Sequence, residues 1–254
     1  MARVRPYYAE GGLSAAFYDV VTAADMRLAG DIESYAALAP AGGAVLELGA
    51  GSGRIAFALA ERGLSVTGVD LAPPMLARAQ ARQAAAPAEI AARLEFRLGD
   101  MTALDLKRRF DLVICPYFTL AHVPAGAAWR NTFAVMARHL EAGGRCAVHL
   151  PLAELMRGAP PPPEHLVLDE PLAGGGRLQL HVLERRFRED IGRLDQVIDY
   201  VERDAAGRLV RRSAERLTYY IADPRPFAEA AGLSLDRPVE PLGGVGEIWV
   251  FRKP

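Results

Sequence analysis

The segment VLELGAGSGR, residues 45–54, carries more information about the fold than any other stretch of this 254-residue chain. It begins with valine and leucine, passes into a turn with three glycines, and leads into a helix-like stretch, Ser52–Arg62. In an open α/β sheet, ligands bind at the carboxyl ends of the strands, and glycine lets a ligand approach the backbone without meeting a Cβ. The segment therefore predicts a strand, a ligand-binding turn and a helix.

Outward from this segment, short β-like runs alternate with longer alanine-rich helical runs over the first 150 residues. Such alternation is typical of a mostly parallel sheet with helices on both faces. The predicted strands are Ala44–Leu48, Ser65–Val69, Arg93–Leu98, Phe110–Cys115 and Arg145–Leu150, and the helices between them are Ser52–Arg62, Pro74–Ala86 and Ala127–Leu140. Ahead of the first strand, Leu13–Leu38 is expected to form one or two helices, broken near Gly30 and Asp31.

The second part of the chain has a different pattern. The run Pro160–Pro163 is expected to be a stiff connector, and three β-like segments with short turns follow it, which indicates an antiparallel meander. These segments are Arg177–Arg188, Leu194–Arg203 and Arg208–Tyr220, with turns at Glu189–Gly192 and Asp204–Gly207. The chain closes with a helix at Phe227–Ala231 and strands near Leu233–Val239 and Glu247–Arg252. The last two strands could pair antiparallel at a sheet edge.

The charge balance and the cysteine content exclude several classes of protein. With 30 basic and 31 acidic residues the formal net charge is −1, so nothing attracts nucleic acid or an anionic membrane in bulk. The two cysteines, Cys115 and Cys146, make neither a disulfide framework nor a zinc site, and no metal site is expected. Neither a secretory signal nor an apolar run of membrane-spanning length is evident. The expectation is a reduced, soluble, cytoplasmic protein.

Two cofactor classes compete for the glycine turn. A dinucleotide fingerprint needs G-x-G-x-x-G/A and an acidic residue about 20 positions further on, and a reading from Gly51 with Asp70 satisfies it. Against it, the first glycine after the strand is Gly49, and the sixth position counted from there is an arginine. Glu47 also places a carboxylate where a pyrophosphate would be repelled, and Asp100 has no task in dinucleotide binding.

Three acidic residues accompany the glycine turn: Glu47 before it, Asp70 at the end of the second strand, and Asp100 in Gly99-Asp100-Met101 after the third. Together with the turn glycines, this pattern resembles the class I S-adenosylmethionine-dependent methyltransferases, most strongly over residues 40–150. The resemblance implies S-adenosylmethionine as the cofactor. It also implies a Rossmann-like α/β fold with a seven-stranded, mostly parallel sheet whose last strand is antiparallel.

The resemblance further implies one methyltransferase domain over residues 1–254. Its parts are an N-terminal helical cap (1–39), a cofactor-binding core (40–150), an inserted antiparallel sheet over the acceptor site (160–222) and a closing helix with strands (223–254). Related enzymes use such an insertion as a wall of the acceptor pocket or as a dimer contact. A homodimer is therefore left open.

The family pattern, carried over position by position, assigns cofactor contacts to a set of residues. In this assignment the glycine backbone holds the methionine moiety with its ammonium near Glu47, Asp70 accepts both ribose hydroxyls, and Asp100 accepts from the adenine amino group. The apolar residues of the set line the adenine ring or the sheet edge. The full set is Tyr18, Glu47, Gly49, Ala50, Gly51, Gly53, Asp70, Leu71, Met75, Asp100, Met101 and Cys115.

Several of these assignments have a structural alternative. Asp70 could cap the helix that begins at Pro74, and Asp100 could be a turn residue after a strand. Met75 and Met101 could simply pack in the core.

The fourth predicted strand runs into CPYFTLAH, residues 115–122, at the same sheet edge. This segment lacks the Asn/Asp-Pro-Pro-Tyr motif of methyltransferases that act on amides and exocyclic base amines. It resembles enzymes that methylate amino sugars, glycine or related amines, in which His122 would act as base or position the acceptor and Tyr18 would close over the methionine end. The alternatives are a loop histidine with a satisfied hydrogen bond and a tyrosine that packs the N-terminal helix. His139 and His149 are expected to be structural.

The leading hypothesis is methyl transfer from S-adenosylmethionine to a small molecule, with an amine nitrogen ahead of a hydroxyl oxygen. The alternatives are an O-methyltransferase of a small metabolite, an NAD(P)-dependent oxidoreductase, and a non-catalytic cofactor-binding protein on the same fold. The expected partner is a small-molecule substrate, and neither nucleic acid nor a membrane is expected.

Overall fold

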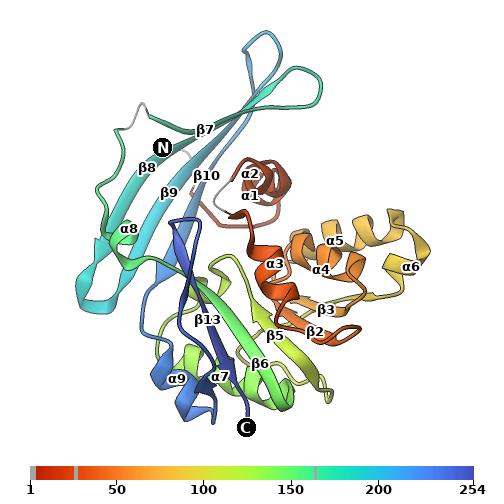
Figure 1. Ribbon diagram of the computed structural model, residues 1–254. Helices are drawn as coiled ribbons and strands as arrows, with labels where there is room; N and C mark the ends of the chain where they lie inside the picture. Colours follow the sequence, from red (N-terminus) through yellow and green to blue (C-terminus); the bar gives the residue numbers. More distant parts are fainter. Residues whose placement is uncertain (1–3, 26–27, 163–164) are drawn as a thin grey trace. The chain divides into compact units, whose positions relative to one another are not determined.

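A computed structural model describes residues 4–25, 28–162 and 165–254 (Figure 1). The chain forms two compact units, one from Met1–Met26 and Ala153–Tyr220, the other from Arg27–Leu152 and Ile221–Pro254. Met26 of the predicted N-terminal helical stretch and Pro163 of the predicted connector lie outside the described residues.

The larger unit is built on a sheet that has eight strands within the described residues. Seven follow the order β11-β13-β6-β5-β2-β3-β4, and β12 pairs with β13. Strands β2 to β6 pair in parallel, and β13 runs antiparallel to β6. The strands are β2 (Ala44–Leu48), β3 (Ser65–Asp70), β4 (Leu94–Leu98), β5 (Phe110–Cys115), β6 (Leu140–Pro151), β11 (Ser234–Leu235), β12 (Glu240–Leu242) and β13 (Gly246–Arg252). The helices are α3 (Asp31–Ala36), α4 (Arg54–Glu61), α5 (Pro73–Ala85), α6 (Ala88–Ala91), the short 3-10 turn η2 (Thr119–His122), α7 (Ala127–His139) and α9 (Arg225–Ala230).

Alternate residues of the central strands point to opposite faces of this sheet, which gives the unit two cores. One core contains Leu46, Leu48 and Val113 together with aromatic side chains of α7 and α9. The other contains Val45 and Leu112 together with side chains of α3 and α4. The ribbon shows these helix pairs on the two sides of the sheet (Figure 1). The predicted parallel sheet with helices on both faces is therefore confirmed.

The closing strands differ from the prediction. The strand expected over Leu233–Val239 is interrupted, and two short strands, β11 and β12, pair with β13 instead. Pro238 lies between them, and proline has no N–H to donate to a strand ladder. These two edge strands bring the sheet to eight strands, where the family resemblance implies seven.

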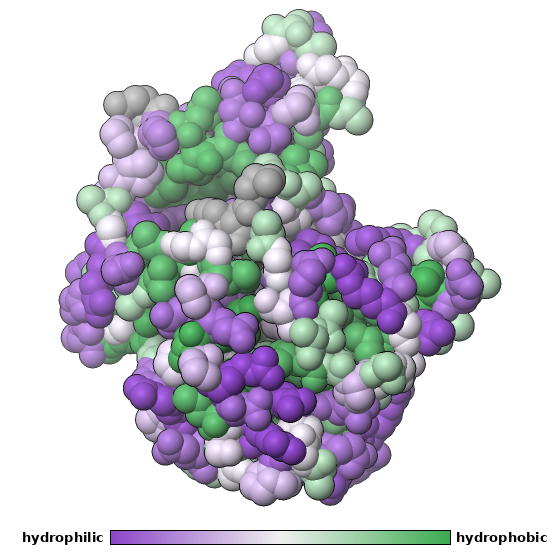
Figure 2. Space-filling view, in the orientation of Figure 1, coloured by the Kyte–Doolittle hydropathy of each residue, from purple (hydrophilic) through white to green (hydrophobic). Residues whose placement is uncertain are grey.

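The smaller unit contains a five-stranded sheet in the order β1-β10-β9-β8-β7. Leu13 and Phe17 from its first helical turns pack with Leu178, Tyr200 and Leu217 of the strands in one apolar cluster. Apolar residues gather over the strands of this unit in the space-filling view (Figure 2). Its elements are β1 (Arg5–Pro6), α1 (Leu13–Ala16), α2 (Tyr18–Ala24), α8 (Ala153–Arg157), β7 (Leu166–Pro171), β8 (Arg177–Arg188), the 3-10 turn η3 (Glu189–Ile191), β9 (Arg193–Arg203) and β10 (Leu209–Tyr220).

Strands β8, β9 and β10 correspond to the three segments of the predicted antiparallel meander. Their turns lie at the expected places, with Gly192 at φ +55° and Gly207 at φ +78°. Two further strands complete the sheet. One is β7, and the other is the two-residue β1, which pairs with Glu215 and Arg216 some two hundred positions later in the chain. A local sequence pattern cannot predict such a pairing.

Candidate functional site

The glycine loop between β2 and α4 adopts a conformation that other residues rarely reach. Gly49, Gly51 and Gly53 all have left-handed φ values, of +77°, +58° and +84°. A Cβ on Gly49 would lie 2.1 Å from a methyl carbon of Thr119, and one on Gly53 would lie 2.9 Å from the ring of Phe96. The loop therefore needs glycine both for its turn and for the close approach of neighbouring side chains.

The backbone N–H groups of this loop are largely used within the protein. Gly49 and Ala50 both donate to the carbonyl oxygen of Val69, at 2.8 and 3.0 Å, and Gly51 donates to Oδ2 of Asp70 at 2.8 Å. A pyrophosphate binds such a loop through free N–H groups at the helix N-terminus. These bonds therefore weigh against the dinucleotide hypothesis and leave the loop suited to a ligand that brings its own donors.

Asp70, at the end of β3, is held at both carboxylate oxygens. Oδ2 accepts from Gly51 and Oδ1 accepts from the N–H of Ala72, each at 2.8 Å. Burial raises the pKa of Asp70, and these backbone donors lower it in turn. Each carboxylate oxygen has a second acceptor site, so a fixed carboxylate can still accept two hydroxyls. Ala72 itself takes the cap position of α5, so Asp70 anchors the loop rather than capping the helix.

Glu47 lies within β2 and is only 1% exposed. Its Oε2 is buried without a hydrogen-bond partner in the described part of the chain. Burial raises the pKa of Glu47 to about 8, with Arg54 acting in the opposite direction and Asp70 adding to the rise. A buried acceptor without a donor is costly, which marks a place where a cationic donor from a ligand fits.

An ion pair that the sequence did not reveal lies beside Glu47. The guanidinium of Arg54 forms two hydrogen bonds with the carboxylate of Asp31, one at 3.1 Å and one shorter. Asp31 is 1% exposed and begins α3, while Arg54 begins α4. The partners are 23 residues apart, and only the tertiary fold brings them together.

Asp100 follows β4 and stays exposed. Its Oδ1 accepts from the N–H and the hydroxyl of Thr102, both at 2.8 Å, which is the turn geometry expected from an aspartate after a strand. Its Oδ2 accepts no hydrogen bond from the described residues and is open to a donor. Gly99 donates to the carbonyl oxygen of Asp70 at 3.0 Å, so the loops after β3 and β4 are joined.

The apolar residues of the predicted set fall into two groups. Leu71 is 68% exposed beside Asp70, where a ligand can cover it. Met75 and Cys115 are buried, and Met101 packs on the core that faces α7. For Met75 and Met101 the core-packing alternative therefore agrees with their surroundings.

The chain after β5 is strained. Tyr117 and Phe118 have positive φ values of +46° and +62°, which are uncommon for aromatic residues and recur at functional sites. His122 ends the 3-10 turn that follows, at the carboxyl edge of the sheet. Tyr18 begins α2 in the smaller unit.

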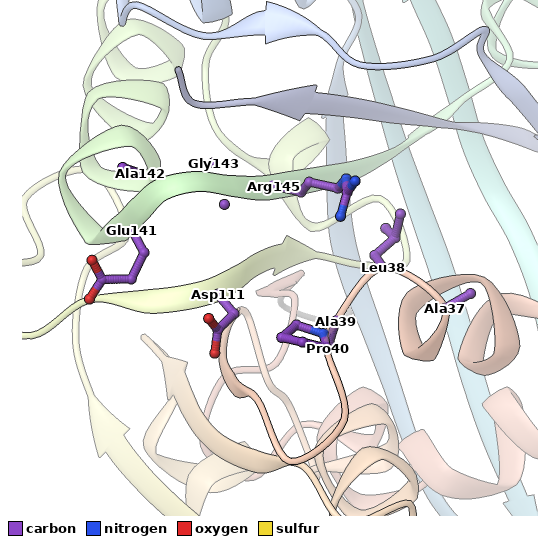
Figure 3. A pocket seen from close by; sticks show the side chains of 10 residues that line it. Ala37, Leu38, Ala39, Pro40, Asp111, Glu141, Ala142, Gly143 and Arg145 are labelled. Carbon is purple, nitrogen blue, oxygen red and sulfur yellow. The ribbon is translucent and has the colours of Figure 1, made fainter.

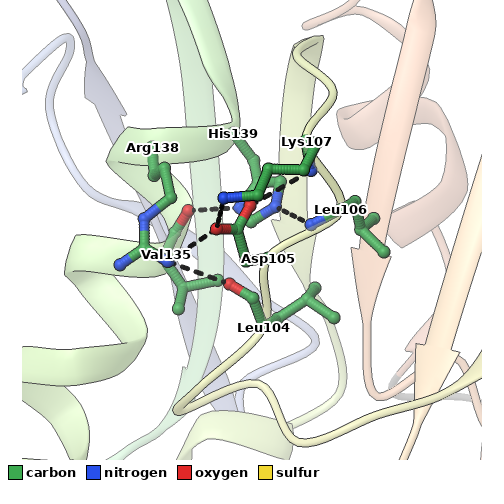
Figure 4. A network of polar contacts seen from close by, with 7 residues as sticks. All are labelled: Leu104, Asp105, Leu106, Lys107, Val135, Arg138 and His139. Carbon is green, nitrogen blue, oxygen red and sulfur yellow. Dashed lines mark hydrogen bonds and ion pairs between the residues drawn. The ribbon is translucent and has the colours of Figure 1, made fainter.

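The two remaining core histidines differ in their surroundings. Nδ1 of His139 lies 2.8 Å from the carbonyl oxygen of Val135, and its Nε2 accepts from the N–H of Leu106, so this ring joins α7 to the loop before β5 (Figure 4). Both ring nitrogens of His149 are buried without a hydrogen-bond partner among the described residues. Burial, aided by the charge of Arg54, lowers the pKa of His149 to about 4.

A pocket of about 300 Å³ lies at the other end of the sheet. Figure 3 shows Asp111, Glu141 and Arg145 around it, with residues from the loop before β2. Because Asp111 and Glu141 are each the second residue of a strand, β5 and β6 respectively, this pocket is at the amino edge of the strands. It is separate from the glycine loop.

Comparisons with known proteins agree with this geometry. Residues 45–144 match the family model described as a methyltransferase domain. Over these residues the chain is similar to methyltransferase domains. The matched region begins at β2 and includes the glycine loop, Asp70 and Asp100. The resemblance inferred from the sequence is thereby confirmed.

One curated relative and several solved structures are similar to this chain. A Geobacillus sp. (strain WCH70) protein that carries the name of a methyltransferase is 38% identical over 89 residues, which span 35% of this chain and 34% of that protein. The structure of the CcbJ methyltransferase from Streptomyces caelestis matches with a TM-score of 0.73 and 22% identity, over 98% of both chains. The S-adenosylmethionine-bound CalS10, an amino pentose methyltransferase from Micromonospora echinaspora, matches with a TM-score of 0.69 and 21% identity, over 93% of this chain and 96% of that one.

The described residues were also compared with the requirements of a membrane span and of a metal site, and they meet neither. No helix among residues 4–25, 28–162 and 165–254 is long and apolar enough to cross a membrane. In the same ranges, no group of three or more His, Cys, Asp or Glu side chains is placed to hold a metal ion.

Proposed function

We propose that this protein transfers a methyl group from S-adenosylmethionine to a small-molecule acceptor. The observation that carries the proposal is the set of three carboxylates on successive strand ends, Glu47, Asp70 and Asp100, around a loop whose N–H groups are already used. An adenosine with a cationic amino-acid tail matches that set, because each carboxylate then meets a donor. The same carboxylates would repel a pyrophosphate.

The residues present fit S-adenosylmethionine. Glu47 would accept from the ammonium of the methionine moiety, Asp70 from the ribose hydroxyls, and Asp100 through its open oxygen from the adenine amino group. Leu71 would cover one face of the adenine. When bound, the cofactor supplies an electrophilic methyl group on sulfur, and the reactivity belongs to the cofactor. The protein's part is to hold both reactants in line and to exclude water.

On the acceptor side, we assign His122 as the residue that takes a proton from the acceptor or orients it, and Tyr18 as the residue that closes over the methionine end. The strained Tyr117–Phe118 turn, which fixes the position of the 3-10 turn ending at His122, supports the first assignment. The similarity to an amino pentose methyltransferase favours an amine nitrogen in a sugar-like acceptor over a hydroxyl oxygen. Methylation of a hydroxyl is the second candidate, and His122 would then have to act as base.

The remaining assignments also belong to this proposal. The chain would act as one methyltransferase domain, with the sheet of β7 to β10 as a wall of the acceptor pocket or as a contact in a homodimer. A cytoplasmic location, without nucleic-acid or membrane partners, is a prediction from the sequence.

A transfer assay tests the proposal. The purified protein is incubated with methyl-labelled S-adenosylmethionine and two panels of small molecules, one of amino sugars and simple amines and one of the matching hydroxyl compounds. Label is expected in the amine panel. Label in the hydroxyl panel alone would support the second candidate, and label in neither panel, with the cofactor bound, would indicate a non-catalytic binding protein.

A further inference from the structure

A cluster of polar side chains lies behind the glycine loop, within the larger unit. Its members come from α3, β2, α4 and β6 and are Asp31, Tyr35, Glu47, Arg54 and His149. All except Arg54 are buried to 1% exposure or less. The guanidinium of Arg54 pairs with Asp31, and its charge lowers the pKa of Tyr35, Glu47 and His149, for each of which burial is the main influence. The proposed mechanism uses Glu47 but neither Asp31 nor Arg54.

With both of its carboxylates ionised, the cluster is short of one positive charge. It holds two carboxylates, Asp31 and Glu47, against one guanidinium. Asp31 takes that guanidinium in a two-pronged pair, the geometry in which arginine binds a carboxylate most strongly. Glu47 has a backbone hydrogen bond from Ala56 and the longer-range attraction of Arg54, but its Oε2 has no hydrogen-bond partner in the described part of the chain. One further cation would complete the cluster.

We propose that Asp31 is a positioning residue for the cofactor. By holding Arg54 in a bidentate ion pair, Asp31 keeps this guanidinium from closing on Glu47 and so reserves the Glu47 carboxylate for the ammonium of the cofactor's amino-acid tail. This inference rests on the assignment of Glu47 under the proposed function. It adds Asp31 and Arg54, which the sequence pattern did not indicate, to the residues that recognise the cofactor's amino-acid tail.

Loss of the Asp31 carboxylate should weaken only the binding of the ligand's amino-acid tail. With Asp31 replaced by asparagine, the guanidinium of Arg54 has only Glu47 as a carboxylate partner within the cluster. The ammonium of a ligand then has to displace a tethered cation. It also enters a cluster whose formal charge, with both carboxylates ionised, is zero instead of −1. The adenosine part of the ligand depends on Asp70 and Asp100, which this change does not reach.

The test compares two ligands by titration calorimetry on the full chain. S-adenosylhomocysteine carries the amino-acid tail, and 5′-methylthioadenosine has the same nucleoside and sulfur without it. For Asp31→Asn we expect the affinity for S-adenosylhomocysteine to fall about tenfold, and that for methylthioadenosine to change by less than about twofold. The matched control is Asp236→Asn, which breaks another partly buried aspartate–arginine pair, with Arg145, and should change neither affinity.

The possible outcomes separate the inference from the function on which it rests. An unchanged affinity for S-adenosylhomocysteine, or equal losses for both ligands, would overturn the role of Asp31, since equal losses indicate a purely structural part. If Glu47→Gln fails to weaken S-adenosylhomocysteine, the cofactor assignment itself fails. If Glu47→Gln weakens it and Asp31→Asn does not, only the present inference fails.

Folding of each variant is checked by thermal unfolding with methylthioadenosine present. If Asp31→Asn gives no cooperative transition, Arg54→Lys takes its place. A lysine ammonium is a point charge on a flexible stem, cannot form the two-pronged pair with Asp31, and is free to reach Glu47. It must therefore show the same tail-specific loss of about tenfold. An Arg54→Lys variant that binds both ligands normally would contradict the inference.

Discussion

Gly49 lies directly under Thr119: a Cβ on the glycine would come within 2.1 Å of the threonine methyl carbon and 2.8 Å of its hydroxyl oxygen. The first residue belongs to the loop after β2 and the second to the turn after β5, so their close packing joins the glycine loop to the segment that carries His122. Thr119 donates its N–H to the carbonyl oxygen of Pro116 at 3.1 Å, which keeps it in place.

We expect Gly49→Ala to destroy the cofactor site. Gly63→Ala is the matched control, because Gly63 also has a left-handed φ, of +88°, but a Cβ there would meet nothing within 4 Å. Both variants carry the strain of a left-handed alanine, about 1–2 kcal/mol. Only Gly49→Ala adds a clash. Calorimetry should find no binding of S-adenosylhomocysteine to Gly49→Ala and normal binding to Gly63→Ala; normal binding by both would refute the close packing.

Glu47 should make the stability of the ligand-free protein depend on pH. Its pKa rises from 4.5 to about 8 in the folded state, mainly by burial, against Arg54 and with Asp70 and Asp31 adding to the rise. The folded state then holds a proton that the unfolded state has lost, so stability is highest below pH 4.5 and declines as pH rises through 8. Thermal unfolding at several pH values should show this decline in the wild type and a flatter profile in Glu47→Gln. Parallel profiles would contradict the assignment.

His149 should also make the stability of the protein depend on pH, but with a loss of stability at acid pH. Its pKa falls from 6.5 to about 4 on folding, so at acid pH the unfolded state takes up a proton more readily than the folded state. The contribution of His149 to stability is therefore complete above pH 6.5 and is lost as pH falls through 4. Because neither ring nitrogen has a partner in the described residues, an apolar replacement leaves no bond unmade. His149→Leu should therefore unfold at a higher temperature than the wild type at pH 5, with a smaller difference at pH 8. His139→Leu, which breaks the bonds to Val135 and Leu106, should lower the melting temperature at both.

His122 is expected to matter for turnover and not for the cofactor. His122→Ala and His122→Phe should lower kcat far more than they change the affinity for S-adenosylhomocysteine, because the proposed role of this histidine is toward the acceptor. The measurement is steady-state transfer to whichever amine the acceptor panels identify, next to calorimetry on the same preparations. Unchanged kcat in both variants would remove His122 from the mechanism.

The sequence predicted the parts of the fold whose causes are local. Strand β2 and the start of α4 follow from a leucine run stopped by glycines, and β5 and β8 span the predicted residues. The carboxylates at Glu47, Asp70 and Asp100 were selected through the resemblance to a family whose acidic positions stand on three successive strands. The closing strands were only partly predicted, since Pro238 divides them.

What sequence reasoning missed depends on contacts between distant positions. Strand β1 exists because two residues near the N-terminus meet β10, and Asp31 matters because α3 brings it to Arg54. A charged residue directly after the last turn glycine was the one available signal for Arg54, and nothing in the local pattern named its partner. His149 was placed in the core correctly, but burial without hydrogen bonds cannot be inferred from a strand pattern.

The most direct test of the central claim is a calorimetric titration of the wild-type protein with S-adenosylhomocysteine and, separately, with NAD⁺. Three carboxylates around a loop with its N–H groups already bonded predict saturable binding of S-adenosylhomocysteine that Glu47→Gln and Asp70→Asn each weaken at least about tenfold, and no binding of NAD⁺. Binding of NAD⁺ without binding of S-adenosylhomocysteine would contradict the account.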